Sequence, residues 1–174
     1  MQLIKQLTRG QCLIAAHAMC MDMPLEKAIA EIGHDGMERI HEELEEPFCF
    51  RGFHQQELID HALDKGVAII NIEALPGSMS GGPDERLYVV QFNVSPEQRI
   101  MEYLQYSTRA IILGQSLLTK TWHAVAWDGS KIYDPQGSVY LIQDAEKYRF
   151  GQIVGLLLYE KLLLNSDSCY TPAG

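Results

Sequence analysis

Cys12 stands at the first position of a segment whose composition predicts a helix. Residues 12–21 read CLIAAHAMCM and are rich in Leu, Ala and Met, which are good helix formers. A thiol at a helix N-terminus lies at the positive end of the helix macrodipole, which favours the thiolate. Because the thiolate is the nucleophilic form of cysteine, this position predicts that Cys12 is a nucleophile.

A base and a group to orient it stand in the second half of the chain. His123 lies on a predicted strand, residues 122–128, and Asp134 directly follows the next one, residues 131–133. Between the two strands, Asp128-Gly129-Ser130 is a hairpin signal, and a two-residue turn of Gly129 with a neighbour would place His123 opposite Asp134. A carboxylate beside the imidazole orients it and supports the imidazolium form, which stabilises a nearby thiolate.

Gln6 lies six residues before Cys12, close enough for its side-chain amide to donate to an attacked carbonyl oxygen as that oxygen becomes negative. The backbone N–H of Cys12 would be the second donor. Loss of one such donor typically costs on the order of 100–1000-fold in rate. The predicted catalytic set is therefore Gln6, Cys12, His123 and Asp134.

The remaining cysteines and histidines are less suited to a catalytic or metal-binding role. A free cysteine is most often a core residue, and we interpret Cys20 in this way. Cys49 and Cys169 fall in a loop and in the tail, with no histidine in register. No two cysteines lie two to four residues apart, and His54 and His61 lack a third ligand, so we expect no metal and no cofactor.

The elements that must hold these residues change type halfway along the chain. Apolar periodicity with Pro and Gly punctuation predicts helices over residues 12–21, 25–32, 37–45 and 54–64. Short apolar or β-branched runs predict strands over residues 67–72, 87–94, 110–113, 122–128, 131–133, 138–142 and 152–159. Helices first and an antiparallel sheet afterwards predict an α+β fold.

The composition, with 47% hydrophobic and 21% charged residues, is typical of a globular protein. We expect a single domain over residues 1–164 and a flexible tail over residues 165–174. The formal net charge of −9 argues against nucleic acid and against an anionic membrane surface as partners. With no apolar run long enough to span a bilayer and no secretory signal, we expect reduced thiols, no membrane insertion and a cytoplasmic protein.

Three motifs together resemble those of the bacteriocin-processing (double-glycine leader) peptidases of the papain-like clan. The stretch QLTRGQC, residues 6–12, is similar to the start of these enzymes, in which a Gln stands six residues before the nucleophilic Cys and an Ala-rich helix follows. WHAVAW, residues 122–127, resembles the family's His strand, and YDPQG, residues 133–137, resembles its Asp-Pro turn. The resemblance covers residues 6–159 and implies a papain-like cysteine protease fold, with an N-terminal helical half packed on a C-terminal antiparallel sheet.

This resemblance implies a cysteine peptidase of stand-alone form that cleaves a peptide bond through a thioester acyl-enzyme. Gln6 would be the oxyanion donor, Cys12 the nucleophile, His123 the general base and acid, and Asp134 the orienting residue. Leu13 stands where the family usually has a small residue, and the ATP-binding cassette and membrane domain of exporter-linked members are not attached. These departures leave the identity of the peptide or protein substrate open.

Two other functions use the same residues or the same fold. A deamidase or transglutaminase would need the same Cys, His and Asp in a narrower cleft, and the bulk of Leu13 and Trp122 favours this alternative slightly. A non-catalytic peptide-binding module would keep only the fold, although such relatives typically lose the nucleophile. The Gly- and Pro-rich loop over residues 75–86 could act as a lid on the cleft or, at its Gly81-Gly82 pair, be a site of self-processing.

Overall fold

The computed structural model describes residues 1–73, 96–116, 121–144 and 150–162 of the 174-residue chain. In this part of the chain the helices are α1 (Cys12–Cys20), α2 (Leu25–Ile32), α3 (Gln55–Asp64) and α4 (Pro96–Leu104). The strands are β1 (Val67–Glu73), β2 (Ala110–Ser116), β3 (Trp122–Trp127), β4 (Ile132–Asp134), β5 (Ser138–Tyr140) and β6 (Phe150–Lys161). A short 3-10 turn covers Ile142–Asp144. The predicted combination of helices with an antiparallel sheet is confirmed.

The six strands form one antiparallel sheet in the order β1-β6-β2-β3-β4-β5. Strand β6 pairs with β1 on one side and with β2 on the other, so the last strand lies inside the sheet. Because successive side chains of a strand point to opposite faces, Ile111 and Ile112 of β2 belong to different cores. Both faces of the central strands are therefore covered.

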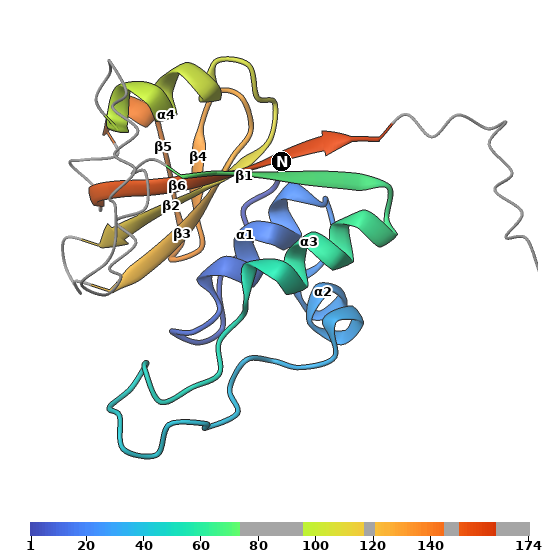
Figure 1. Ribbon diagram of the computed structural model, residues 1–174, viewed down its shortest axis with the longest axis vertical. Helices are drawn as coiled ribbons and strands as arrows, with labels where there is room; N and C mark the ends of the chain where they lie inside the picture. The colour runs from blue at the N-terminus through green and yellow to red at the C-terminus, as the bar shows by residue number, and fades with distance from the viewer. Residues whose placement is uncertain (74–95, 117–120, 145–149, 163–174) are drawn as a thin grey trace, which may run out of the picture.

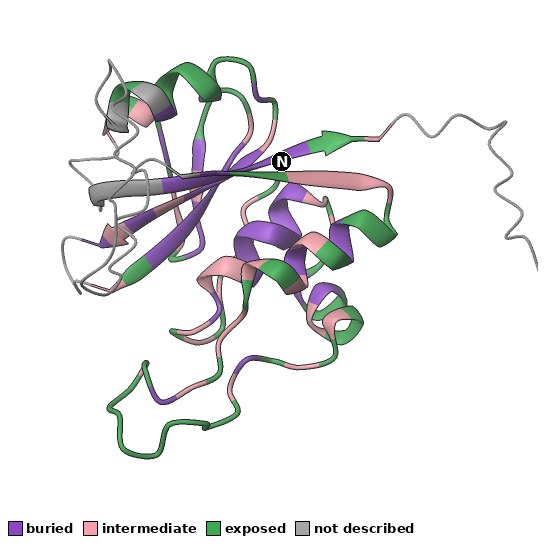
Figure 2. Ribbon diagram, viewed as in Figure 1, coloured by how far each residue is buried: buried purple, intermediate pink, exposed green. Residues whose placement is uncertain are grey.

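Helices cover the two faces unequally (Figure 1). Helices α1 and α3 pack on one face and α4 packs on the other, while α2 packs against α1 and α3. Figure 2 shows that α1 and the central strands are the most deeply buried elements. None of the helices in the described part of the chain is both long and apolar enough to cross a membrane.

Helix α1 lies close to β3 because the side chains between them are small. Ala16 of α1 shares a buried cluster with Ala124 and Ala126 of β3. Cys12 begins α1 one turn before Ala16, and His123 directly precedes Ala124 on β3. This alanine contact therefore brings the start of the helix towards the histidine of the strand.

The predicted helix over residues 37–45 is wrong. Residues 34–54 form an extended arm that folds back on itself: Gly52 N–H donates to Gly36 O at 2.9 Å, and Arg51 N–H donates to Glu38 O at 2.8 Å. On a helix, Ile40 would lie on the apolar side, yet it is 49% exposed in the arm. Since a short helix needs an apolar face packed on a core to persist, the backbone pairing within the arm prevails over local helix propensity.

One helix was not predicted, and several predictions fall on residues that the structure does not describe. Helix α4 begins with Pro96 at its first position and places Ile100 and Leu104 four residues apart, both of which are helix signals. The strand over residues 87–94, the proposed lid over residues 75–86 and the tail over residues 165–174 lie outside the described residues.

Candidate active site

Cys12 is the first residue of α1 and is half-buried. Gln11 precedes the helix, and its carbonyl accepts the hydrogen bond of Ala15 N–H at 3.0 Å, which closes the first turn. As the first helical residue, Cys12 has a backbone N–H without an intrahelical acceptor. The thiol thus lies at the positive end of a buried helix, as the sequence predicted.

His123 and Asp134 form a buried hydrogen-bonded pair, with 3.0 Å between His123 Nε2 and Asp134 Oδ1. The imidazole is 5% exposed and the carboxylate is completely buried. The Asp134 carboxylate also accepts from the backbone N–H of Gln136 at 2.8 Å, so the turn after β4 holds it in place. This turn fixes the carboxylate, and the carboxylate fixes the ring.

The strand register that brings the pair together differs from the predicted one. Ala126 pairs with Tyr133 rather than with Lys131, which shifts β4 by two residues. His123 and Asp134 are consequently diagonal neighbours instead of directly opposite each other. A shift of two residues preserves the face of each side chain, and diagonal neighbours remain within reach of long side chains. The predicted contact is therefore present although the predicted register is wrong.

Asp128 determines this register. Its Oδ1 accepts from Ser130 N–H at 2.9 Å and from Lys131 N–H at 2.8 Å, which closes the turn on Gly129 and Ser130. Burial acts to raise the pKa of Asp128, but these bonds and one from the Tyr133 hydroxyl outweigh it and lower the pKa to about 2. An ionised Asp128 thus holds the turn at neutral pH.

The pKa of His123 is raised to about 9. Burial alone would lower it, but the hydrogen bond with Asp134, the proximity of Cys12 and the negative charges of both partners outweigh burial. Since Asp134 takes Nε2, the ring nitrogen left for Cys12 is Nδ1. An imidazolium between a carboxylate and a sulfur atom is the arrangement that supports a thiolate at neutral pH.

Gln6 lies beside the turn that carries Asp134. Its backbone N–H donates to Pro135 O at 2.9 Å. Its side chain is half-buried, and the buried Oε1 has no hydrogen-bond partner among the described residues. A buried carbonyl oxygen without a partner typically costs about 1–3 kcal/mol, and such groups call for an explanation.

Cys12 and His123 lie in the wall of a groove with a volume of about 840 Å³. Asp134 is buried behind His123, and Gln6 is not one of the lining residues. The other walls come from the loop before α1, the arm, the start of α3 and the facing ends of β2 and β3. Apolar side chains in these walls include Leu13, Ile40, Phe48, Phe50, Phe53 and Trp122.

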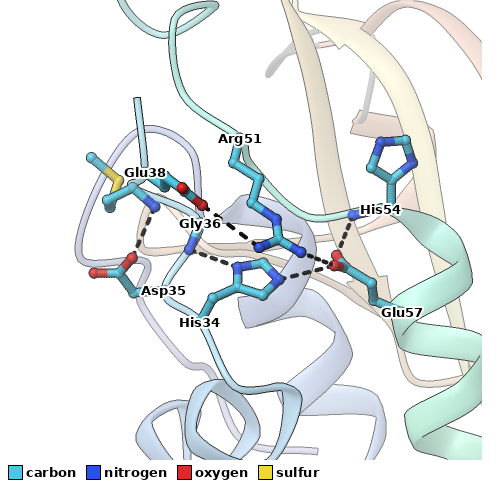
Figure 3. A network of polar contacts seen from close by, with 8 residues as sticks. His34, Asp35, Gly36, Glu38, Arg51, His54 and Glu57 are labelled. Atoms are coloured by element: carbon cyan, nitrogen blue, oxygen red, sulfur yellow. Dashed lines mark hydrogen bonds and ion pairs between the residues drawn. The ribbon is translucent and has the colours of Figure 1, made fainter. Parts of the chain in front are cut away.

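The arm is fastened at its base by a polar network around Glu57 of α3 (Figure 3). His34 Nε2 and Arg51 donate to Glu57 Oε1 at 3.0 and 2.9 Å, and the backbone N–H of His54 donates to Oε2 at 2.8 Å. Burial raises the pKa of Glu57, but these bonds outweigh it and the pKa is lowered. An ionised Glu57 therefore ties both ends of the arm to the start of α3.

The other described thiols are unsuited to chemistry. Cys20 is 2% exposed and donates to Ala110 O at 3.3 Å, and burial raises the pKa of its thiol well above the usual range. Cys49 is completely buried within the arm. Across the described ranges no group of three or more His, Cys, Asp or Glu side chains could hold a metal ion.

Two features near the site were not found from sequence. One is the fastened arm, whose signal was the pair Gly36 and Gly52, both in the left-handed region of backbone conformation. The other is the side chain of Gln11, which makes two hydrogen bonds beside the nucleophile. No local pattern marks either bond of Gln11, because both partners depend on loop conformation.

Comparison with known proteins gives a structural likeness only. The chain is similar to the crystal structure of a double glycine motif protease from an AMS/PCAT transporter in complex with the leader peptide, with 16% sequence identity and a TM-score of 0.48, over 90% of this chain and 91% of that chain. No family model and no curated protein matches the sequence. A likeness at this level carries no functional conclusion, which must come from the residues of this chain.

Proposed function

We propose that the protein is a cysteine hydrolase that cleaves peptide bonds. The observation that carries this proposal is that His123 hydrogen bonds with a fully buried carboxylate, Asp134, and shares the wall of a groove with the half-buried thiol of Cys12. A histidine with a purely structural role does not need an acidic partner that raises its pKa to about 9. It also does not need to lie beside a thiol at the start of a helix.

Acylation would begin when the Cys12 thiolate attacks the carbonyl carbon of the bound peptide. The carbonyl oxygen becomes negative, and the backbone N–H of Cys12 with the side-chain amide of Gln6 would stabilise it. The His123 imidazolium then donates its proton to the departing amine, which leaves as the C–N bond breaks. The products of this step are a thioester on Cys12 and a peptide with a new N-terminus.

Deacylation would use the same groups in the opposite sense. Neutral His123 takes a proton from water, and the resulting hydroxide attacks the thioester carbonyl. The C–S bond breaks, sulfur leaves as thiolate, and His123 keeps the proton, which restores the ion pair. Asp134 would hold the ring in one orientation through both steps.

The role of Gln6 rests on its place in the fold. Its backbone N–H is bonded to Pro135 O, so Gln6 is attached to the turn that holds Asp134. The side-chain oxygen is the buried end, and an amide whose oxygen faces inward can turn its NH₂ group outward. This orientation is the one that a donor to an oxyanion requires.

The shape and lining of the groove favour a peptide substrate. Its volume falls within the range of ligand sites, and its lining combines apolar side chains of the arm with polar side chains such as His54, Gln55 and Gln56. The facing ends of β2 and β3 supply part of the wall, where an extended chain would lie. A small amide would leave most of this surface without contact.

A trapping experiment tests the proposal. The protein is incubated with a peptide library at neutral pH, quenched in acid and examined by mass spectrometry for an acyl group on Cys12 and for new peptide N-termini. We expect both in the wild type and neither in Cys12→Ala or Cys12→Ser, because a His123 that already holds its proton cannot activate a serine hydroxyl. Cys20→Ala is the matched control and should behave as the wild type.

The other functions correspond to different outcomes. Ammonia release without new N-termini would replace the peptidase by a deamidase, and acyl transfer to lysine would indicate a transglutaminase. Binding of peptides without acylation would leave only a binding module. If iodoacetamide near neutral pH modifies Cys12 no faster than an ordinary thiol, the activated nucleophile itself is refuted.

A further inference from the structure

Gln11 is a polar residue that is 3% exposed and directly precedes the proposed nucleophile. Its side-chain Oε1 accepts from the backbone N–H of Leu7 at 3.3 Å, and its Nε2 donates to the backbone carbonyl of Asp35 at 3.1 Å. Its backbone N–H donates to Thr8 O at 3.2 Å. One side chain thus holds two chain segments that are distant in sequence.

The two segments belong to different parts of the proposed site. Leu7 directly follows Gln6, the proposed oxyanion donor. Asp35 lies at the base of the arm that lines the groove, next to His34 and Gly36 (Figure 3). A second bond joins the same segments, since the Thr8 hydroxyl donates to the sulfur of Met37 at 3.0 Å.

We infer that Gln11 is a positioning residue that couples the arm to the segment carrying Gln6 and Cys12. This inference rests on the proposed function, because the alignment that it explains is that of an acyl-transfer site. A peptide seated against the arm presses on a wall whose base is bonded to Gln11, and Gln11 in turn holds Leu7. Misplacement of reacting groups by about 1 Å typically costs on the order of 100-fold in rate.

The chemistry of the side chain makes the inference testable. At this place the chain needs one acceptor and one donor on a single planar group, which a neutral amide supplies. An ionised carboxylate of the same shape keeps the acceptor for Leu7 but has no donor for Asp35 O. A protonated carboxyl regains the donor. Gln11→Glu should therefore be defective when ionised and restored when protonated.

The experiment compares Gln11→Glu with the wild type from pH 5 to pH 8. Two rates are measured on each protein: acylation of Cys12 by a cleaved peptide, and alkylation of Cys12 by iodoacetamide. We expect acylation by the variant to be about 10–100-fold slower than the wild type at pH 8 and to approach it as the pH falls. The alkylation ratio should change far less than the acylation ratio, because alkylation needs neither Gln6 nor a seated peptide.

Controls separate positioning from general damage. Gln2→Glu, at an exposed position, should match the wild type at every pH. Gln11→Met keeps the volume and removes both hydrogen bonds, so its acylation should be slow at all pH values. The inference is overturned if Gln11→Met acylates normally, if the Gln11→Glu ratio does not change with pH, or if alkylation and thermal stability fall in parallel with acylation.

Failure of the proposed function has a different signature. A wild-type protein that no peptide acylates refutes the proposed function, and the inference falls with it. A wild type that acylates while the Gln11 variants acylate equally well overturns the inference alone. The two failures are read from different proteins in the same assay.

Discussion

His123 is subject to two opposing influences on its charge. Burial disfavours the imidazolium, whereas Asp134 and Cys12 favour it and prevail, so its pKa lies at about 9. At neutral pH the ring therefore holds the proton that a departing amine needs. A histidine that was neutral at this pH would have to take up a proton before it could protonate the amine.

Asp134→Asn should move the loss of activity at high pH to lower values. In the wild type, kcat/KM should fall above a pH of about 9, as His123 loses its proton. The variant loses the bond and charge that raise the pKa of His123 but keeps the burial that lowers it, so the fall should begin at lower pH. The rate at neutral pH should also drop on the order of 100–10,000-fold.

Peptide cleavage between pH 6 and pH 10 and the titration of the His123 ring by NMR measure both effects. Asp128→Asn is the matched control, since it removes the charge of a carboxylate in the same hairpin while its amide oxygen can still accept the bonds from Ser130 and Lys131 that fix the register. It should leave the fall in activity at about pH 9. An unchanged profile in Asp134→Asn would contradict the role given to that carboxylate.

At the scale of residues, the sequence predicts which side chains lie together, but it does not predict the strand register that brings them together. Type and spacing indicate Cys12, His123 and Asp134, and the structure pairs His123 with Asp134 and places His123 and Cys12 in the wall of one groove. The hairpin register was wrong by two residues, because Gly129 can form a turn with either neighbour. Asp128 decides between them through bonds that require the folded turn.

At the scale of elements, the arm depends on a glycine in a crowded place. Gly36 has a φ of +73°, and a Cβ there would lie 2.7 Å from Phe53 Cε2 and 3.0 Å from Gly52 O. Phe53 lines the groove. Gly33 has a φ of +93°, but a Cβ there would meet nothing within 4 Å. The two glycines share backbone strain and differ in crowding.

Gly36→Ala should therefore be more harmful than Gly33→Ala. Each substitution should cost about 1–2 kcal/mol in the free energy of unfolding for the left-handed backbone alone. Gly36→Ala should cost a further 1–3 kcal/mol, roughly, for overpacking, and should raise KM for peptide because Phe53 must move. Urea unfolding and peptide cleavage measure these effects. Equal losses in the two variants would show that crowding at the arm is unimportant.

The elements that sequence predicted well are those with local signals. Helix α2 has the predicted bounds, because Pro24 precedes it and Gly33 ends it in the left-handed conformation. The helix predicted over residues 37–45 was wrong because the arm's backbone pairs with itself across more than ten residues. No local pattern distinguishes such a segment from a helix. Helix α4 has local signals too, Pro96 at its first position and apolar residues four apart, but they are few compared with those of α2.

At the scale of the molecule, a buried polar chain joins α1, α2, α3 and β6. His17 Nδ1 lies 2.7 Å from the Tyr159 hydroxyl, His17 Nε2 lies 2.9 Å from His61 Nδ1, and His61 Nε2 lies 2.8 Å from Glu31 Oε2. Burial, and then the charge of His61, lower the pKa of His17 to about 3, so its ring is neutral. Glu31 accepts from His61, one proton is shared between the facing nitrogens of His61 and His17, and the Tyr159 hydroxyl completes the chain at His17 Nδ1.

Tyr159→Phe should destabilise the protein by about 1–3 kcal/mol, because it leaves His17 Nδ1 buried without a hydrogen-bond partner. Tyr133→Phe is the matched control. It removes a hydroxyl that donates to the partly exposed Asp128, where water can replace it, and should cost about 0.5–1.5 kcal/mol. Urea unfolding of both variants at pH 7 gives the comparison, and a larger loss in Tyr133→Phe would contradict the buried chain.

The same chain should make the stability of the whole molecule sensitive to acid. An unfolded histidine takes up a proton near pH 6.5, whereas folded His17 does so only at about pH 3. Its contribution to stability is therefore fully present above pH 6.5 and is lost as the pH falls towards 3. Over this interval the unfolded chain binds one more proton at this site, which lowers the free energy of unfolding by about 1.4 kcal/mol per pH unit.

His17→Gln should remove this dependence, since an amide can hydrogen bond to both neighbours and does not titrate. Urea unfolding of both proteins at pH 7, 6, 5 and 4 measures the two slopes, and their difference should correspond to one proton. The Asp128 contribution is common to both proteins and is lost only as the pH falls from 3.8 towards about 2. Equal slopes in the two proteins would show that His17 accepts its proton within the fold, and that the helix carrying Cys12 is not held by a neutral histidine.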